Sequence, residues 1–382
     1  MGNSEAIPAR VLMPTWRKFM PIAARGLPYE AQDVFAAVDD VDLVALEPGS
    51  GFRWKQMWQR RLLWRDITKR LAYLNPGLKR VRLQKDYDLL VQVCTSWWDL
   101  FYINAIDGWT DRCRTKICIL DELWVGWLPL FKYWLPALRR FDHLFVAYEG
   151  TAKPLSEAVG RPCHFLPSAV DVLRFSPFPN PPARAIDVYS MGRRWDGVHR
   201  SLLELSRSKE IFYIYDTAQD AGDMKLQDPA QHRSMLGNLA KRTWFFMVAP
   251  AKMGVPEETF GQIEIGYRYF EGAAAGTIML GKAPECPAFG RLFDWPDPVI
   301  PIQPDGSDIV ETIRRLRLNP ERLQEMSRRN AVEALLRHDW VYRWEQILNV
   351  AGMKPVPALA NRKKLLQDLA AEGAAKKQAC IA

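Results

Sequence analysis

The chain has 382 residues, a formal net charge of +8 and 48% hydrophobic residues, a composition typical of a soluble globular protein. Its length exceeds what one hydrophobic core usually supports and predicts two or three domains. No run of about 18 apolar residues is present, so we expect no membrane-spanning helix. The first residues lack a basic-then-apolar pattern, so we also expect no signal segment. The six cysteines form no CxxC pair and no cluster with histidine, so we expect a cytoplasmic protein without a zinc site.

Apolar runs of strand length alternate with helical segments along the first half of the chain. Strands are expected at residues 9–13, 41–46, 87–94, 116–120 and 142–147. Helices are expected at residues 29–38, 53–73 and 153–159. This alternation predicts a parallel sheet with both faces covered.

The positive charge is concentrated between residues 52 and 85, where eleven Lys and Arg residues accompany a single acid, Asp66. Three tryptophans lie among them: Trp54, Trp58 and Trp64. Such a stretch is suited to anionic lipid headgroups, nucleic acid or an anionic glycan. Because Arg61 and Arg65 fall among the apolar positions, an ordinary surface helix with some buried tryptophans explains the pattern equally well.

The pattern changes after residue 164. Four prolines lie between residues 177 and 182, and proline cannot continue a helix or a central strand, so this part is an extended linker. We therefore predict an amino-terminal domain at 1–170, a linker at 171–185, a second domain at 186–339, a closing helix at 340–354 and a mobile tail at 355–382 that is helical at most in part.

The same alternation resumes after the linker. Strands are expected at residues 185–191, 211–215, 244–248 and 277–280. Helices are expected at residues 197–207, 230–241, 308–318, 320–337 and 340–350. The second half is therefore also expected to be an α/β domain.

Residues 259–281 combine charged and very small side chains. Arg268 and Glu271 are three positions apart and share one face of a helix. The small residues 272–275 follow, and Gly276 ends the helix. A carboxylate and a guanidinium beside such a gap could bond the hydroxyls and phosphates of a nucleotide sugar. Taken alone, the stretch favours a simpler interpretation, a helix packed tightly on a sheet with a surface ion pair.

Four segments, taken in order, resemble motifs of the two-domain glycosyltransferases with the GT-B fold. The closer likeness is to the "glycosyl transferases group 1" superfamily, including its CgeB-like and family 4-like members. The segments are Leu166–Pro177 (with Ala169 in place of the usual glycine), Val188–Arg193, Arg268–Glu271 with Gly276, and His338–Trp340 with Arg343. The resemblance covers residues 164–350. It implies an α/β fold in which an acceptor-side and a donor-side Rossmann-like domain face each other across a cleft with their parallel sheets.

This resemblance also assigns roles to particular residues. Glu271 would bond the ribose of a nucleotide-sugar donor, and Arg268 with Arg193 or Arg194 would hold its diphosphate. Further donor-binding candidates are Arg200, Gly192, Gly272 and Gly276. No metal and no cofactor besides the donor is implied, so fixed cations and backbone N–H groups must stabilise the charge on the leaving phosphate.

The sequence departs from the family in three places. The first glutamate of the usual acidic pair would fall at Ile263, and the nearest acid, Glu264, is one place off. Residues 14–16 replace an expected glycine pair, and the first-domain histidine has no obvious counterpart. Asp121 and Glu122 follow the end of an expected strand, where ligands of α/β sheets gather, so both are acceptor-side candidates. Capping of the loop explains them equally well.

The resemblance implies a retaining hexosyltransferase that moves a sugar from a nucleotide-sugar donor to a glycan, lipid-linked or polysaccharide acceptor. The basic stretch suggests a cytoplasmic protein that contacts the inner face of the cell membrane. Three alternatives stay open: a nucleotide-sugar epimerase or hydrolase of the same fold, a nucleic-acid-binding protein that uses the basic stretch, and a non-catalytic scaffold. Nucleic acid is not the expected partner.

Overall fold

The computed structural model describes residues 10–65, 69–130, 133–217 and 221–379. Ala9, Asp66 and residues 380–382, which belong to the predicted first strand, basic stretch and tail, lie outside this description. The chain forms two compact units. The first comprises Met1–Pro21, Gln32–Pro167 and Trp344–Leu359, and the second comprises Ile22–Ala31, Ser168–Arg343 and Ala360–Ala382.

The first unit is built on a six-stranded parallel sheet with the strand order β2-β1-β4-β6-β7-β8. The strands are β1 (Val11–Thr15), β2 (Val41–Ala45), β4 (Tyr87–Cys94), β6 (Cys113–Leu120), β7 (His143–Val146) and β8 (Cys163–Phe165). All of β1 and all but one residue of β4 are buried, as expected of apolar strands covered on both faces. Two short strands, β3 (Val81–Arg82) and β5 (Ile106–Asp107), pair with each other.

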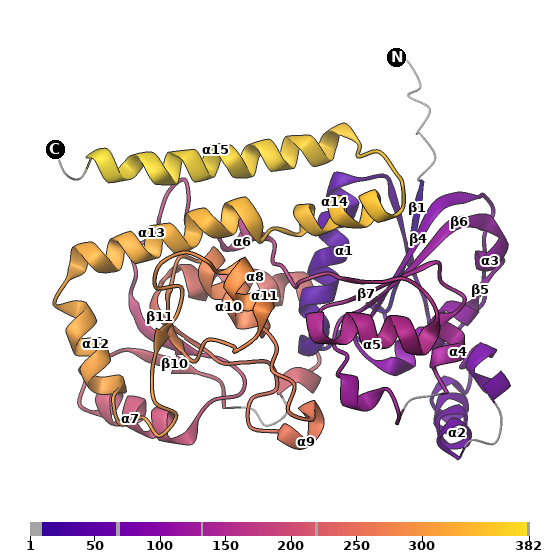
Figure 1. Cartoon of the computed structure of the whole chain (residues 1–382), viewed down its shortest axis with the longest axis horizontal. Helices are drawn as coiled ribbons and strands as arrows, with labels where there is room; N and C mark the ends of the chain where they lie inside the picture. Colours follow the sequence, from indigo (N-terminus) through magenta and orange to yellow (C-terminus); the bar gives the residue numbers. More distant parts are fainter. Residues whose placement is uncertain (1–9, 66–68, 131–132, 218–220, 380–382) are drawn as a thin grey trace. The chain divides into compact units, whose positions relative to one another are not determined.

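Helices cover this sheet. One of them, α5 (Glu149–Val159), packs against β7 and β8 and lies beside β7 in Figure 1. The α-helices are α2 (Phe52–Trp64), α3 (Trp109–Arg112), α4 (Leu135–Leu138), α5 (Glu149–Val159), most of α1 (Gly26–Val38) and most of α14 (Trp340–Val350). The 3₁₀ helices are η2 (Lys69–Tyr73), η3 (Trp97–Ala105) and η4 (Val125–Trp127). The helix predicted at 53–73 is therefore shorter than expected, because α2 ends at Trp64. Within this unit Trp344 of α14 donates a hydrogen bond from Nε1 to Asp39 Oδ2 at 2.8 Å and stacks on Phe35.

The second unit is built on a five-stranded parallel sheet with the strand order β10-β9-β11-β12-β13. The strands are β9 (Ile186–Ser190), β10 (Tyr213–Tyr215), β11 (Thr243–Val248), β12 (Ile278–Gly281) and β13 (Ile300–Pro301). The helices are η1 (Ala23–Arg25), α6 (Val172–Phe175), α7 (Asp196–Arg207), η5 (Ala221–Asp223), α8 (Pro229–Lys241), α9 (Pro256–Thr259), α10 (Tyr267–Ala274), α11 (Pro287–Leu292), α12 (Ile309–Arg317), α13 (Pro320–Arg337) and α15 (Pro357–Ala379). Two parallel sheets with helical cover confirm the predicted α/β class.

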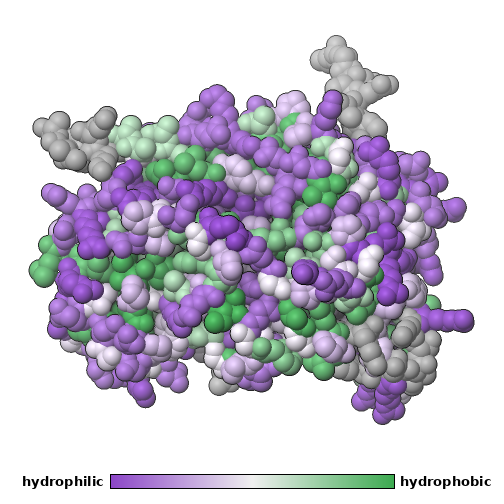
Figure 2. Space-filling model, in the orientation of Figure 1, coloured by the Kyte–Doolittle hydropathy of each residue, from purple (hydrophilic) through white to green (hydrophobic). Residues whose placement is uncertain are grey.

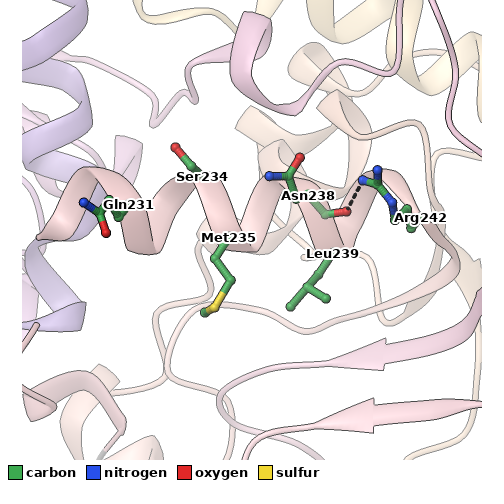
Figure 3. A pocket seen from close by; sticks show the side chains of 6 residues that line it. All are labelled: Gln231, Ser234, Met235, Asn238, Leu239 and Arg242. Atoms are coloured by element: carbon green, nitrogen blue, oxygen red, sulfur yellow. Dashed lines mark hydrogen bonds between the residues drawn. The ribbon is translucent and has the colours of Figure 1, made fainter.

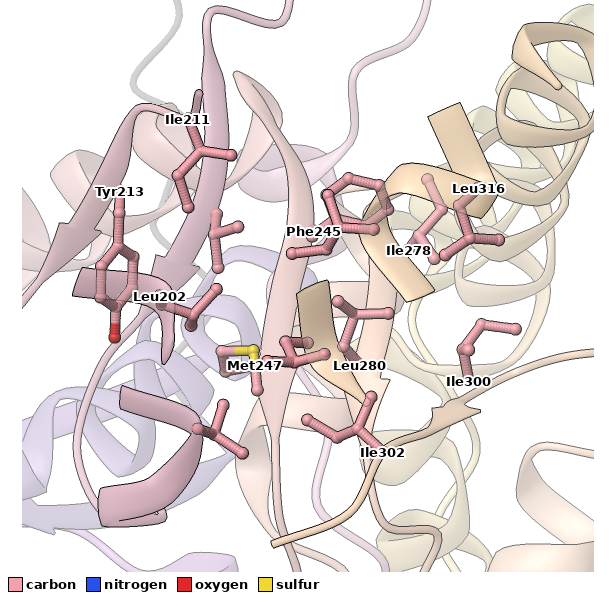
Figure 4. Close-up of a cluster of buried hydrophobic side chains, with 14 of the residues drawn as sticks. Leu202, Ile211, Tyr213, Phe245, Met247, Ile278, Leu280, Ile300, Ile302 and Leu316 are labelled. Atoms are coloured by element: carbon pink, nitrogen blue, oxygen red, sulfur yellow. The ribbon is translucent and has the colours of Figure 1, made fainter. Parts of the chain in front are cut away.

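Side chains alternate between the two faces of the second sheet. Phe245, Ile278 and Leu280 point to the face covered by α7, α12 and α13, where they form one apolar cluster with Leu202 (Figure 4). The intervening residue Met279 points to the opposite face, against α10. Because α10 carries the predicted Arg268–Glu271 pair, this second face positions the candidate site.

The carboxyl-terminal part of the chain differs from its prediction. Residues 357–379 form one long helix, α15, drawn in yellow in Figure 1, where the sequence predicted a segment helical at most in part. Arg362 of α15 donates to both oxygens of Asp339 at 2.8 and 2.7 Å and to Asp171 at 2.7 Å, and Leu366 is fully buried. These contacts supply the tertiary stabilisation that a marginal helix requires.

The surface is mixed in character. Figure 2 shows hydrophilic residues projecting over the visible face, with hydrophobic ones between them. Among the helices in the described ranges, none is both long and apolar enough to cross a bilayer.

Candidate active site

Glu271 is a buried carboxylate on α10 with both oxygens occupied. The residue is 1% exposed, yet Oε1 accepts a hydrogen bond from Arg233 and Oε2 accepts one from Arg268. Arg268 lies one helical turn before Glu271, as the spacing predicted, and 28% of its side chain is exposed. The predicted ion pair is therefore formed. Its carboxylate is buried and its guanidinium is partly exposed, so it is not a pair of surface charges.

Arg233 of α8 extends this pair into a row of four alternating charges. Its Nε donates to Glu30 Oε2 at 2.8 Å and its Nη2 donates to Glu30 Oε1 at 3.2 Å, while Nη1 donates to Glu271. The order is Glu30, Arg233, Glu271, Arg268, and all but Arg268 are almost completely buried. Each inner charge thus has an opposite charge on both sides, which offsets the cost of removing it from water.

Glu30 anchors the inner end of the row. It lies in the first part of α1, which groups with the second unit. Its Oε1 accepts the backbone N–H of Asp171 at 2.8 Å, and Arg174 Nη1 is 3.5 Å from Oε2. The carboxylate is therefore held from several directions, which fixes Arg233 in turn.

The electrostatics of the row keep both inner groups charged. Burial raises the pKa of the Glu271 carboxyl, but Arg268 and Arg233 lower it by more, so its pKa lies below the ordinary value. Burial lowers the pKa of Arg233, but Glu30 and Glu271 raise it by more. Glu271 is consequently an anion at neutral pH and a hydrogen-bond acceptor only.

A second cluster follows the carboxyl ends of β9 and β10. Gly192 has a φ of +84°, which favours glycine, and its N–H donates to Asp216 Oδ2 at 3.1 Å. Arg194 donates to the Asp216 carbonyl at 2.8 Å and lies over the Tyr215 ring. The side chains of two other predicted cations, Arg193 and Arg200, are exposed, and within the described ranges neither makes an ion pair.

Tyr189 connects the two clusters. The Tyr189 hydroxyl lies 3.6 Å from the Sδ atom of Met191. Burial raises the pKa of Tyr189 to about 12, and Arg268, Glu271 and Asp216 are near enough to influence it. The charge row and the turn after β9 therefore belong to one region at the carboxyl edge of a parallel sheet, where α/β proteins bind ligands.

The comparisons with known proteins bear on this region. Residues 227–349 match a family model described as "Glycosyl transferase-like", and Arg233, Arg268 and Glu271 lie inside the matched segment. A solved α-glucosyltransferase in complex with UDP and a 13-mer DNA matches with a TM-score of 0.52 at 13% identity, covering 90% of this chain and 99% of that one. The fold is that of the GT-B glycosyltransferases.

Two other solved structures agree with the GT-B fold. Anabaena HepE in complex with UDP matches with a TM-score of 0.50 at 12% identity, over 90% of this chain and 99% of that one. A glycosyltransferase from Rickettsia africae matches with a TM-score of 0.50 at 9% identity, over 89% of this chain and 97% of that one. Among curated protein sequences, none matches significantly. The predicted resemblance to GT-B glycosyltransferases is thereby confirmed at the level of the fold.

The two glycines predicted to bind the donor are packing residues in this GT-B chain. A Cβ at Gly272 would lie 3.0 Å from Met279 and 3.1 Å from Phe246. A Cβ at Gly276 would lie 2.8 Å from the Ser327 carbonyl, and φ there is +62°. The space beside them holds the protein's own sheet and α13, so the small residues let α10 approach those elements. A role of Gly272 and Gly276 in donor binding stays a prediction.

The acceptor-side candidates lie in the first unit, directly after β6. Asp121 is largely buried and its N–H donates to the Cys94 carbonyl at 2.9 Å. Glu122 Oε1 accepts from Trp124 Nε1 at 3.3 Å. The Asp121 backbone and the Glu122 carboxylate therefore take part in local structure at the carboxyl edge of the first sheet.

A separate pocket of about 570 Å³ lies on the outward face of α8. Figure 3 shows its lining side chains along one side of that helix, with Arg242 donating to the Asn238 carbonyl at 3.1 Å. The lining residues are Gln231, Ser234, Met235, Asn238, Leu239 and Arg242. None of the predicted site residues lines it.

Sequence reasoning missed Arg233 and Glu30. Both carry a signal in retrospect, because each is a charged residue on an otherwise apolar helix face. Arg233 is three and seven positions before the buried Leu236 and Ala240, and Glu30 is four before the buried Val34. A charge at such a position either finds a buried partner or destabilises the fold.

Proposed function

We propose that the protein transfers a sugar from a nucleotide-sugar donor to an acceptor hydroxyl. The observation that carries this proposal is the row of buried charges ending in Glu271 and Arg268, in the segment that matches the glycosyl transferase-like family. An anionic carboxylate with a partly exposed guanidinium beside it offers one group for ribose hydroxyls and one for phosphate.

Donor binding would rearrange the outer end of the row and leave the inner end in place. Arg268, whose side chain is 28% exposed, would turn from Glu271 to the diphosphate, which would open Glu271 Oε2 to the ribose hydroxyls. Arg233 stays fixed, because Glu30 holds it on the far side. Part of the donor site is therefore pre-organised before the donor arrives.

Transfer requires stabilisation of the leaving nucleoside diphosphate. The bond from the anomeric carbon to the phosphate oxygen breaks, a bond to the acceptor oxygen forms, and the acceptor proton passes to the leaving phosphate. Arg268, Arg193, Arg194 and Arg200 are the cations we assign to this phosphate, with backbone N–H groups near Gly192. We propose a retaining, metal-independent reaction.

The proposal extends to the donor base and the acceptor. Two structures that share the fold were solved with UDP, which makes a uridine nucleotide the first candidate. We propose a glycan, polysaccharide or lipid-linked acceptor on the cytoplasmic side, with Asp121 and Glu122 on the acceptor side.

The test is thermal unfolding of wild type and Glu271→Gln with UDP, GDP, ADP, dTDP and CMP and their sugar conjugates. A ligand at a hundred times its dissociation constant adds about 2.7 kcal/mol to the free energy of unfolding. That shifts the midpoint by several degrees, at roughly 2–4 °C per kcal/mol. A shift with one nucleotide family, abolished in Glu271→Gln, supports the proposal. No shift with any of them favours a non-catalytic scaffold, and release of the free sugar or its epimer without an acceptor favours a hydrolase or epimerase.

A further inference from the structure

Helix α2 in the first unit turns large apolar side chains toward solvent. Trp54 is 63% exposed, and Met57 and Trp58 are each 41% exposed. With Arg61 they follow the spacing of one helix face, while Leu63 on the opposite face is 2% exposed. The apolar residues are therefore at the point of the helix farthest from the core, which reverses the usual pattern of a surface helix.

The same helix is uniformly positive. Residues 52–65 contain five Lys and Arg residues and no acid. Arg53, Lys55 and Arg61 are exposed at the flanks and on the outer face, and the Arg61 guanidinium lies 5.7 Å from the Trp58 ring. Cations thus surround the exposed tryptophans. In the sequence, the same cations only disturb the apolar pattern expected of a helix face.

We propose that α2 is a docking surface for an anionic lipid bilayer. Trp54, Met57 and Trp58 enter the headgroup region, where amphipathic tryptophan rings are favoured, and the flanking cations contact lipid phosphates. This partner fits both properties of the face, since a bilayer surface offers apolar depth and negative charge together. The inference stands independently of the proposed sugar transfer.

Nucleic acid matches only part of this surface. Its phosphates would pair with the cations, and unpaired bases could stack on the tryptophans. The thioether of Met57 in the middle of the face has no comparable partner on a nucleic-acid strand. Lipid is therefore the partner we commit to, and nucleic acid becomes an outcome of the test.

The experiment is flotation of the full chain with vesicles of phosphatidylcholine alone and with about a third phosphatidylglycerol, at low and high salt. One variant removes the apolar contacts (Trp54→Ser with Trp58→Ser). A second removes the charges (Arg53→Gln, Lys55→Gln and Arg61→Gln). These side chains are exposed, so both variants should keep the wild-type unfolding midpoint.

Two matched controls change the same chemistry in the second unit. Phe212→Ser with Leu318→Ser removes apolar side chains that are 55% and 85% exposed. The charge control consists of three substitutions of exposed cations: Arg207→Gln, Lys209→Gln and Arg315→Gln. Each control matches its α2 variant in kind and number.

We expect wild type and both controls to float with the anionic vesicles, and each α2 variant to bind at least about tenfold more weakly. Two results would overturn the proposal: wild type that ignores anionic vesicles, or α2 variants that float like wild type. Loss of short single-stranded DNA binding in the α2 variants, without any vesicle binding by wild type, would instead assign the face to nucleic acid. Nucleotide-induced thermal shifts should be unchanged in all four variants, so a failure here is distinct from a failure of the donor site.

Discussion

The carboxylate of Glu30 and the guanidinium of Arg233 meet at 2.8 Å in the interior of the second unit, although 203 positions separate them in the sequence. Arg233 also holds Glu271, so the amino-terminal segment supports the candidate donor carboxylate through one intermediate side chain. This is a positioning arrangement, because neither Glu30 nor Arg233 is the exposed end of the row.

The first prediction concerns the stability of this arrangement. Arg233→Met leaves two buried carboxylates without their shared partner, so we expect the free energy of unfolding to fall by about 3–5 kcal/mol. Arg200→Met removes an exposed cation of the same unit and should change it by less than about 0.5 kcal/mol. Urea titration compares the two. Equal effects would contradict the role given to Arg233.

Substitution of Arg268 should affect catalysis strongly and stability little, the opposite of what we expect for Arg233. Arg268→Gln removes a partly exposed cation, so stability should change little, while Glu271 keeps Arg233 as partner. If Arg268 stabilises the leaving phosphate, kcat should fall by about 10²–10³-fold. Steady-state kinetics with the donor found by thermal shift measures it. A change in KM with normal kcat would reduce Arg268 to a ground-state binding role.

Gly276 and Gly192 form a matched pair for backbone strain. Both have positive φ, at 62° and 84°, so alanine should cost about 1–2 kcal/mol at each. At Gly276 the new Cβ would also meet the Ser327 carbonyl at 2.8 Å, whereas at Gly192 it meets nothing within 4 Å. Gly276→Ala should therefore lower the unfolding midpoint clearly more than Gly192→Ala. Similar midpoints would mean that α13 moves aside without cost.

His338 should make stability depend on pH. It is fully buried among Phe270, Phe293 and Trp295, and burial, with Arg343 and Arg337, lowers its pKa well below the ordinary value. As the pH falls, His338 binds a proton in the unfolded chain before it does so in the folded one. The free energy of unfolding therefore keeps its full value above about pH 6.5 and decreases below that pH by about 1.4 kcal/mol per pH unit.

The variant His338→Leu isolates this contribution from the other histidines. Urea titrations at several values between about pH 7.5 and pH 5 should give a slope reduced by about one proton relative to wild type. An unchanged slope would show that the acid sensitivity arises elsewhere.

Much of the fold could be predicted because it is encoded locally. The apolar run at 87–94 coincides with β4, and Pro320 marks the start of α13, which ends at Arg337 as expected. The long helix α15 was missed because its stability depends on distant contacts such as the pairing of Arg362 with Asp171. Such contacts leave no periodic signature in the segment itself.

The candidate site likewise contains residues whose contacts follow from local sequence and residues whose contacts depend on the fold. Arg268 and Glu271 are one turn apart, so their pairing follows from helix geometry alone. Arg233 of α8 and Glu30 of the first part of α1 join them only in the folded second unit. The small residues 272–275 indicated a helix packed tightly on a sheet, but that Gly272 meets Met279 is a property of the folded sheet.

The contacts of Arg362 have a further consequence. The chain passes between the two units five times, and Arg362 follows the last passage by three residues. Its partners Asp171 and Asp339 lie within five residues of two other passages. One guanidinium therefore holds together three segments of the chain, each of which lies next to a point where the chain passes from one unit to the other. A single substitution at Arg362 would remove the hydrogen bonds that join these three segments, although the segments are far apart in the sequence.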